Sequence, residues 1–138
     1  MGEKEPKKLL DISFSMGFAQ KLPPEIKEAY FAPFPDEKYM AGAAKWPLLV
    51  PISRDDPAAV VMNNAREVLK TWQKPALVMF SDKDPVTAGG DGFFRHIIPT
   101  AKDQPEITIK DAGHFLQEDK GEEVAEQIMK FIERTPLD

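Results

Sequence analysis

Cysteine is absent from the 138 residues of the sequence, which excludes a disulfide framework, a thiolate metal site and a cysteine nucleophile. No apolar run approaches the roughly 18 residues that a membrane span needs. The charged start, MGEKEPKK, is not followed by the apolar region of a signal peptide, and Pro6 stands where the myristoylation pattern requires Ser or Thr. We therefore expect a cytoplasmic protein with no membrane partner.

Positive charge is in the minority, with 18 Lys and Arg against 23 Asp and Glu, so the net charge is −5. Nucleic acids and anionic membranes bind basic patches, and we expect neither as the main partner. Hydrophobic residues make up 42% of the chain and charged residues 30%, a balance typical of a globular protein. The length suits one ordinary domain and is too short for two.

Proline is abundant, at 13 residues, and its spread along the chain indicates element boundaries. Pro24 predicts the start of a short helix over residues 25–31, and a second short helix is predicted over residues 36–44. Residues 1–8 are polar, and we expect them to be disordered. The apolar segment 9–17 carries no clear secondary-structure signal. With its two short helices, the first half is predicted to be helical and broken by proline.

A longer amphipathic helix is predicted to begin at Asp55-Asp56-Pro57, where an Asp supplies the N-cap and proline takes the first helical position. Apolar residues then recur at helical spacing. They are Val61, Ala65, Val68, Leu69 and Trp72.

The second half alternates between predicted strands and helices. The apolar run PALVMF (residues 75–80) predicts a strand buried on both faces, and residues 106–110 predict a second, shorter strand. Helices are predicted over residues 93–98 and 121–133. This order is typical of an α/β fold with a parallel sheet. Because two strands do not complete such a sheet, we expect the remaining strands to be missing or supplied by another chain.

Polar side chains follow both predicted strands, where sites form in parallel α/β sheets. Asp82 and Asp84 follow the first strand, and His114 follows the second. An Asp and then a His at consecutive strand ends match the end of the Ser–Asp–His order of α/β-hydrolases. A general-base imidazole needs one free nitrogen and a carboxylate on the other. We favour Asp84 over Asp82 as that carboxylate and His114 as the base; the competing interpretation is an ordinary surface histidine.

Three segments carry a family signature. They read AYFAPFPDEKYMAGAAKWPLLVP (residues 29–51), KPALVMFSDKDPVT (74–87) and ITIKDAGHFLQEDKGEEVA (107–125). In this order they resemble the haloalkane dehalogenases of the α/β-hydrolase fold. The resemblance covers about residues 22–132 and corresponds to the C-terminal part of that family, namely the end of the helical cap and the last two strands of the sheet.

The resemblance implies an incomplete α/β-hydrolase fold, with a helical cap remnant over residues 9–72 and a C-terminal core segment over 73–138. It implies hydrolysis of carbon–halogen bonds in short haloalkanes, without a metal or an organic cofactor. In this family an Asp nucleophile displaces halide, and water activated by a His hydrolyses the resulting ester. By motif, His114 would be this base and Asp84 its orienting acid. The residues expected to contact the small apolar substrate are Trp46, Pro47, Val50, Val86 and Phe115, although Trp46 also fits plain packing within the cap.

The nucleophile of that mechanism is absent, because the sequence contains no G-x-[SD]-x-G elbow and no H-G-x-P oxyanion loop. We therefore expect little or no halide release from this chain alone. Three alternatives stay open. The chain could be a small serine esterase that uses Ser15 of SFSMG, an epoxide hydrolase, or a non-catalytic half that binds an N-terminal complementing chain or associates with itself.

Overall fold

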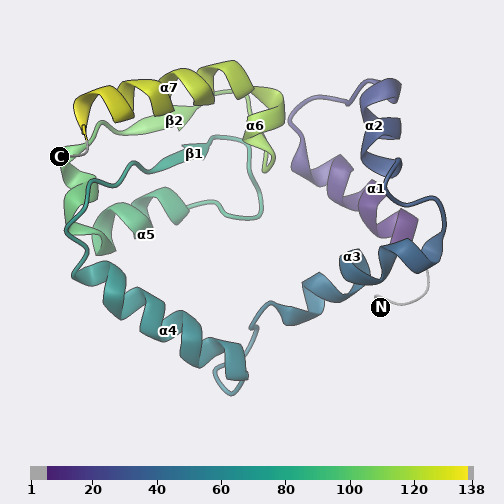
Figure 1. Cartoon of the computed structure of the whole chain (residues 1–138), viewed down its shortest axis with the longest axis horizontal. Helices are drawn as coiled ribbons and strands as arrows, with labels where there is room; N and C mark the ends of the chain where they lie inside the picture. Colours follow the sequence, from purple (N-terminus) through teal and green to yellow (C-terminus); the bar gives the residue numbers. More distant parts are fainter. Residues whose placement is uncertain (1–5, 137–138) are drawn as a thin grey trace. The chain divides into compact units, whose positions relative to one another are not determined.

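The computed structural model describes residues 6–136 (Figure 1). In chain order the elements are α1 (Pro6–Gly17), α2 (Pro24–Phe31), η1 (Glu37–Met40), α3 (Ala41–Lys45), η2 (Trp46–Leu49), α4 (Pro57–Lys70), β1 (Met79–Ser81), α5 (Gly90–Ile97), η3 (Pro99–Asp103), β2 (Ile107–Ile109), α6 (Leu116–Asp119) and α7 (Gly121–Arg134). Contacts divide the chain into an N-terminal unit, residues 6–15 with Lys21–Asn64, and a C-terminal unit, Met16–Gln20 with residues 65–136.

The N-terminal unit is helical. The apolar segment 9–17, whose structure the sequence left open, belongs to α1, and so do residues 6–8, which were predicted to be disordered. Residues 1–5 of that prediction lie outside the described residues. The Phe14 ring packs against Tyr30 and Phe31, at ring-centroid distances of 5.3 and 5.6 Å, and so joins α1 to α2.

Prolines begin helices of this unit, as predicted for element boundaries. Helix α2 starts at Pro24, because proline has the φ of a first helical residue and needs no N–H partner there. The helix predicted over residues 36–44 is instead two elements, the 3₁₀ helix η1 followed by α3. Asp36 caps η1 by accepting a hydrogen bond from the Lys38 N–H at 2.8 Å.

Helix α4 begins at the predicted position. The Asp56 carboxylate accepts the N–H of Ala58 at 2.8 Å, which satisfies one of the free donors of the first turn, and Pro57 is the first helical residue. The helix ends at Lys70, so Trp72 lies beyond it.

The C-terminal unit contains a two-stranded parallel sheet. Met79 pairs with Ile107, and Ser81 pairs with Ile109. Strand β1 is shorter than the predicted run 75–80, since β2 is its only partner among residues 6–136 and pairs with just three of its residues. In Figure 1, α5 lies beside β1 and α7 lies beside β2. The predicted strand–helix–strand–helix order is therefore confirmed.

The core of this unit lies around β1. Val78, Ile98 and Ala101 are buried, and five partly buried residues pack against them: Leu69, Ala76, Phe80, Phe94 and Ile97. Helix α5 begins earlier than predicted, after Gly89, whose φ of 82° is one that glycine adopts without strain. Among residues 6–136, no helix has the length and the apolar character needed to cross a membrane.

Candidate active site

The loops after β1 and β2 lie side by side because the two strands are parallel and in register. The N–H groups of Asp82 and Lys83 donate to the carbonyls of Ile109 and Ala112, at 3.1 and 3.0 Å. The Ser81 hydroxyl donates to the Gly113 carbonyl at 2.6 Å. These bonds continue the sheet pairing beyond the strands, and they bring the first loop close to the residue that precedes His114.

Asp84 and His114 form a hydrogen-bonded pair at this edge. The His114 Nδ1 lies 3.0 Å from Asp84 Oδ2. The Asp84 side chain is 5% exposed, whereas the His114 side chain is 35% exposed. The pair therefore has a buried carboxylate and an imidazole that solvent or a substrate can reach.

Asp84 is surrounded by donors. Besides His114, the Thr87 hydroxyl donates to Oδ2, and the Val86 N–H donates to Oδ1 at 2.7 Å. Burial alone would raise the pKa of Asp84. The hydrogen bonds from Thr87, from His114 and from the backbone N–H groups of Val86 and Thr87 outweigh burial and lower its pKa to about 2. The carboxylate is consequently ionised at neutral pH.

The ionised state of Asp84 determines which imidazole nitrogen carries hydrogen. An ionised carboxylate can only accept hydrogen bonds, so His114 Nδ1 must be the donor. In the neutral imidazole Nε2 then keeps its lone pair. This is the arrangement of a general base, in which the carboxylate orients the ring and stabilises the imidazolium formed when Nε2 takes a proton.

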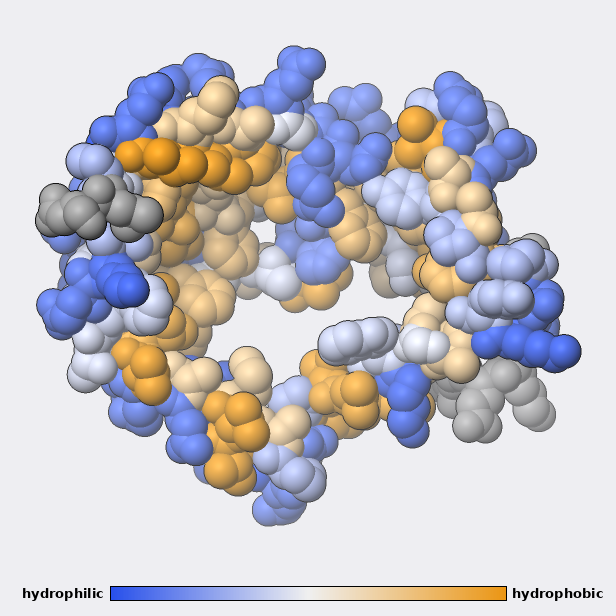
Figure 2. All heavy atoms as spheres, in the orientation of Figure 1, coloured by the Kyte–Doolittle hydropathy of each residue, from blue (hydrophilic) through white to orange (hydrophobic). Residues whose placement is uncertain are grey.

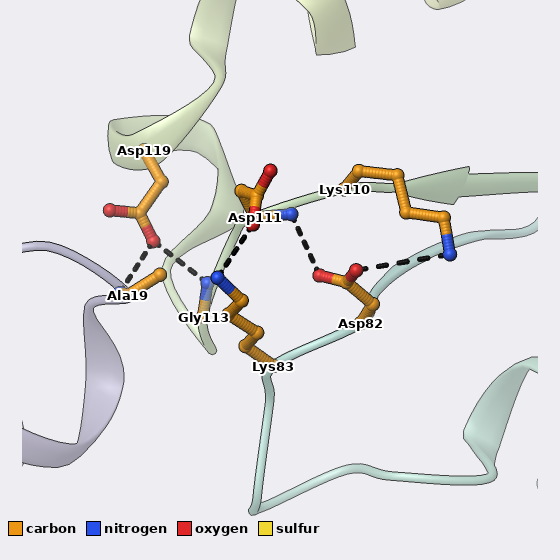
Figure 3. Close-up of polar contacts among 7 residues, drawn as sticks. All are labelled: Ala19, Asp82, Lys83, Lys110, Asp111, Gly113 and Asp119. Carbon is orange, nitrogen blue, oxygen red and sulfur yellow. Dashed lines mark hydrogen bonds and ion pairs between the residues drawn. The ribbon is translucent and has the colours of Figure 1, made fainter.

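Asp82, the other candidate carboxylate, has different partners (Figure 3). Its Oδ1 accepts the Asp111 N–H at 2.8 Å, and its Oδ2 lies 3.8 Å from Lys110 Nζ. Lys83 Nζ lies 2.6 Å from Asp111 Oδ1, and this contact raises the pKa of Lys83 and lowers that of Asp111. Of the two candidates, Asp84 alone contacts His114.

A further carboxylate, Asp119, holds the backbone around the site. Its Oδ2 accepts the Gly113 N–H at 2.8 Å and the Ala19 N–H at 2.9 Å (Figure 3). The sequence motif that contains His114 also contains Asp119, but nothing local indicates a partner 100 positions away. The interpretation of the sequence gave this residue no role.

Six curated relatives that are 41–50% identical to this chain are named haloalkane dehalogenases. The chain is 50% identical over 120 residues to a haloalkane dehalogenase of Psychrobacter cryohalolentis, covering 87% of this chain and 40% of that protein. It is 44% identical over 115 residues to a haloalkane dehalogenase of Mycobacterium marinum, covering 83% and 38%. The chain is a relative of the haloalkane dehalogenases. No protein-family model matches it.

The fold agrees with this relationship. The crystal structure of the haloalkane dehalogenase DatA from Agrobacterium tumefaciens superposes with a TM-score of 0.77 at 22% identity, covering 96% of this chain and 45% of DatA. The predicted partial α/β-hydrolase fold is thereby confirmed. The chain spans about 40% of the length of its haloalkane dehalogenase relatives.

The remaining residues predicted from the dehalogenase resemblance lie in both units. The Phe115 ring packs edge-on against His114, with ring centroids 5.2 Å apart. Val86 orients Asp84 through its backbone N–H, and the residue as a whole is 61% exposed. Trp46, Pro47 and Val50 belong to the N-terminal unit and are exposed, Trp46 by 71%. Substrate contact by these residues stays a prediction.

Ser15 does not have the setting of a hydrolase nucleophile. A nucleophile elbow is a sharp turn between a strand and a helix. Ser15 instead lies in the last turns of α1, where its hydroxyl donates to the Ile12 carbonyl at 2.8 Å. The serine esterase alternative requires a strand before SFSMG, and the structure contradicts it because Pro6–Gly17 is a helix.

The side chains of the described residues were also compared with the requirements of a metal site. Within residues 6–136, no group of three or more His, Asp and Glu side chains is placed so that it could hold a metal ion.

Proposed function

We propose that this chain carries the histidine–carboxylate pair of a hydrolytic haloalkane dehalogenase, and that it corresponds to the C-terminal part of such an enzyme. The observation that carries the proposal is the hydrogen bond between His114 Nδ1 and the buried Asp84, formed where two parallel strands end. His114 is the general base and Asp84 is the residue that orients it. The relatives named haloalkane dehalogenase favour this reaction over the opening of an epoxide.

The reaction has two steps, and His114 acts in the second. A carboxylate nucleophile outside this chain attacks the carbon that bears the halogen, so a C–O bond forms and the halide leaves with the electron pair of the C–X bond. Water then attacks the carbonyl carbon of the ester while His114 Nε2 takes its proton. The acyl–oxygen bond breaks, and the leaving alkoxide takes the proton from the His114 imidazolium and departs as the alcohol. The nucleophile is left as a carboxyl group that loses its proton to solvent. A positioned base of this kind accelerates such a step by about 10²- to 10⁴-fold.

We place the nucleophile in an N-terminal part of the enzyme outside these 138 residues, because they hold no G-x-[SD]-x-G elbow. Two features support the association of this chain with the part that carries the nucleophile. Each strand of the sheet pairs only with the other among residues 6–136, which leaves free edges. Hydrophobic side chains also lie at the surface (Figure 2), and on α7 they are Ile128, Met129 and Ile132. We place the assembled enzyme in the cytoplasm, with a short haloalkane as substrate.

The test is reconstitution. The part of the Psychrobacter cryohalolentis relative that this chain does not match is produced with the 138-residue chain, both as a separate polypeptide and as a single fused chain. Halide release from 1-bromobutane is then measured. We expect none from the 138-residue chain alone, and steady release from the fused chain that His114→Gln abolishes. His96→Gln is the matched control, because His96 is exposed on α5.

Two outcomes would contradict the proposal. One is halide release by the 138-residue chain alone that depends on His114. The other is a folded, fused chain that releases no halide. If the separate polypeptides fail where the fused chain succeeds, the base is confirmed and association is the missing step. A stable self-associated state of the 138-residue chain, measured by light scattering, would favour a second copy as the partner.

A further inference from the structure

The loop that carries His114 is held on both sides of the histidine by one distant segment, residues 17–19. Before the histidine, the N–H groups of Gly113 and Ala19 converge on the same oxygen, Asp119 Oδ2, at 2.8 and 2.9 Å (Figure 3). After it, the Phe115 N–H donates to the Gly17 carbonyl at 2.8 Å. The backbone on each side of His114 is therefore tied to residues 17–19.

Packing between residues 17–19 and the loop that carries His114 is tight. A Cβ atom on Gly113 would lie 2.6 Å from the Gly17 carbonyl oxygen and 2.8 Å from the Ala19 nitrogen, both of them backbone atoms. The rings of Phe18 and Phe115 also pack together, with centroids 5.0 Å apart. A side chain at Gly113 would thus overlap the backbone of residues 17–19, and the Asp119 carboxylate accepts the hydrogen bonds of both N–H groups in this contact.

We propose that Asp119 is a positioning residue for His114, an inference that rests on the proposed role of His114 as general base. Hydrogen bonds from backbone N–H groups to a carboxylate are shorter and stronger than those to neutral acceptors. By holding Gly113 and Ala19 with one oxygen, Asp119 fixes the backbone next to the histidine. The Asp84 hydrogen bond fixes the ring itself. Together these contacts fix the direction from which Nε2 accepts a proton from water.

The position of a base matters because a displacement of about 1 Å is enough to slow a reaction about 100-fold. Asp84 holds only Nδ1, so the imidazole could still move with its loop. Asp119 removes that freedom from a point outside the pair, and it does so without touching the imidazole or the reacting atoms. Its loss should therefore impair the step in which His114 acts more than the step that precedes it.

The first test uses the full 138-residue chain and no activity. Asp119→Ala removes the shared acceptor, and Asp119→Asn keeps a carbonyl oxygen in its place. Glu122→Ala is the control, since it removes an exposed carboxylate nearby. Amide exchange of Gly113 and Ala19, and the ¹⁵N spectrum of the two histidines, are measured by NMR. We expect Asp119→Ala to speed exchange of both amides by at least about tenfold and to broaden or shift the His114 Nδ1–H signal.

A structural role is distinguished from a positioning role by the amides of the β1–β2 ladder. We expect them to keep their exchange rates in all three variants, and we expect Asp119→Asn to restore part of the wild-type His114 signal. The proposal is overturned if the His114 signal does not change in Asp119→Ala. It is also overturned if the ladder amides accelerate as much as Gly113 in both Asp119 variants, because Asp119 would then support only the fold.

The second test uses the fused, reconstituted enzyme. With Asp119→Ala, we expect the first equivalent of halide to appear at the wild-type rate and steady turnover to fall by about 100-fold. Equal slowing of both phases would overturn the positioning role. If the wild-type fused chain releases no halide, the proposed function fails, while the NMR test still decides whether Asp119 holds the His114 loop.

Discussion

Thr87 and His114 donate hydrogen bonds to the same oxygen, Oδ2 of Asp84. The orienting carboxylate is thus itself oriented, by a hydroxyl from its own loop and by the Val86 N–H, which binds its other oxygen. An ionised carboxylate held in this way cannot rotate freely, so its hydrogen bond to the imidazole has a defined direction.

Removing the Thr87 hydroxyl should raise the pKa of Asp84. Thr87→Val preserves the shape of the side chain but removes the donor, and the hydrogen bond from Thr87 is the largest of the influences that lower this pKa. Thr87→Ser keeps a hydroxyl and serves as the control. We expect a ¹³C NMR titration of the carboxyl group to place the pKa of Asp84 higher in Thr87→Val than in wild type, with Thr87→Ser close to wild type. Equal values for wild type and Thr87→Val would contradict the role of the hydroxyl.

Asp84 should also make stability depend on pH in the acidic range. Its pKa is about 2 in the folded chain and 3.8 in its ordinary state, so the folded state favours the ionised form. The contribution is complete above about pH 4 and is lost as the pH falls through about 2, with a maximum of about 2 kcal/mol. Urea unfolding of wild type and Asp84→Asn should show a stability difference that narrows between pH 5 and pH 2.5. A gap that stays constant over this range would show that the charge of Asp84 contributes nothing to stability.

Local signals in the sequence were sufficient for several elements. Asp56 and Pro57 mark the start of α4, because a cap and a first-turn proline act within a few residues. The order of strand ends predicted a carboxylate beside His114, since parallel strands in register bring their following loops together, and Asp84 was favoured over Asp82.

Contacts across the chain were not predictable in the same way. Helix α1 lacked a clear pattern because its packing against α2, through Phe14, depends on tertiary structure. The role of Asp119 depends on Ala19, whose N–H has no sequence signature. Strand β1 is shorter than the predicted strand over residues 75–80 for a related reason. The length of a strand is determined by its partners and not only by its apolar residues.

Gly113 should tolerate no larger residue. In Gly113→Ala the new methyl group would overlap backbone atoms of residues 17–19, which cannot move aside as a flexible side chain would. We expect a loss of about 1–3 kcal/mol in the free energy of unfolding. Gly92→Ala is the matched control, because nothing lies within 4 Å of the added Cβ, and in helix α5 it should stabilise the chain by about 0.4–1 kcal/mol. Urea midpoints of the two variants should therefore move in opposite directions. A Gly113→Ala midpoint at or above the wild-type value would contradict the close packing of Gly113 against residues 17–19.

His114→Gln should stop the fused, reconstituted enzyme after the ester has formed. Displacement of halide needs the nucleophile but no base, whereas hydrolysis of the ester needs a group that takes a proton from water. We therefore expect this variant to release about one equivalent of halide per site and then stop, with the enzyme mass increased by one alkyl group. Rapid-quench halide measurement and intact-protein mass spectrometry follow the two products. Continued turnover would remove His114 from the mechanism, and absence of the first equivalent, in a variant that folds like wild type, would mean that His114 acts before the ester forms.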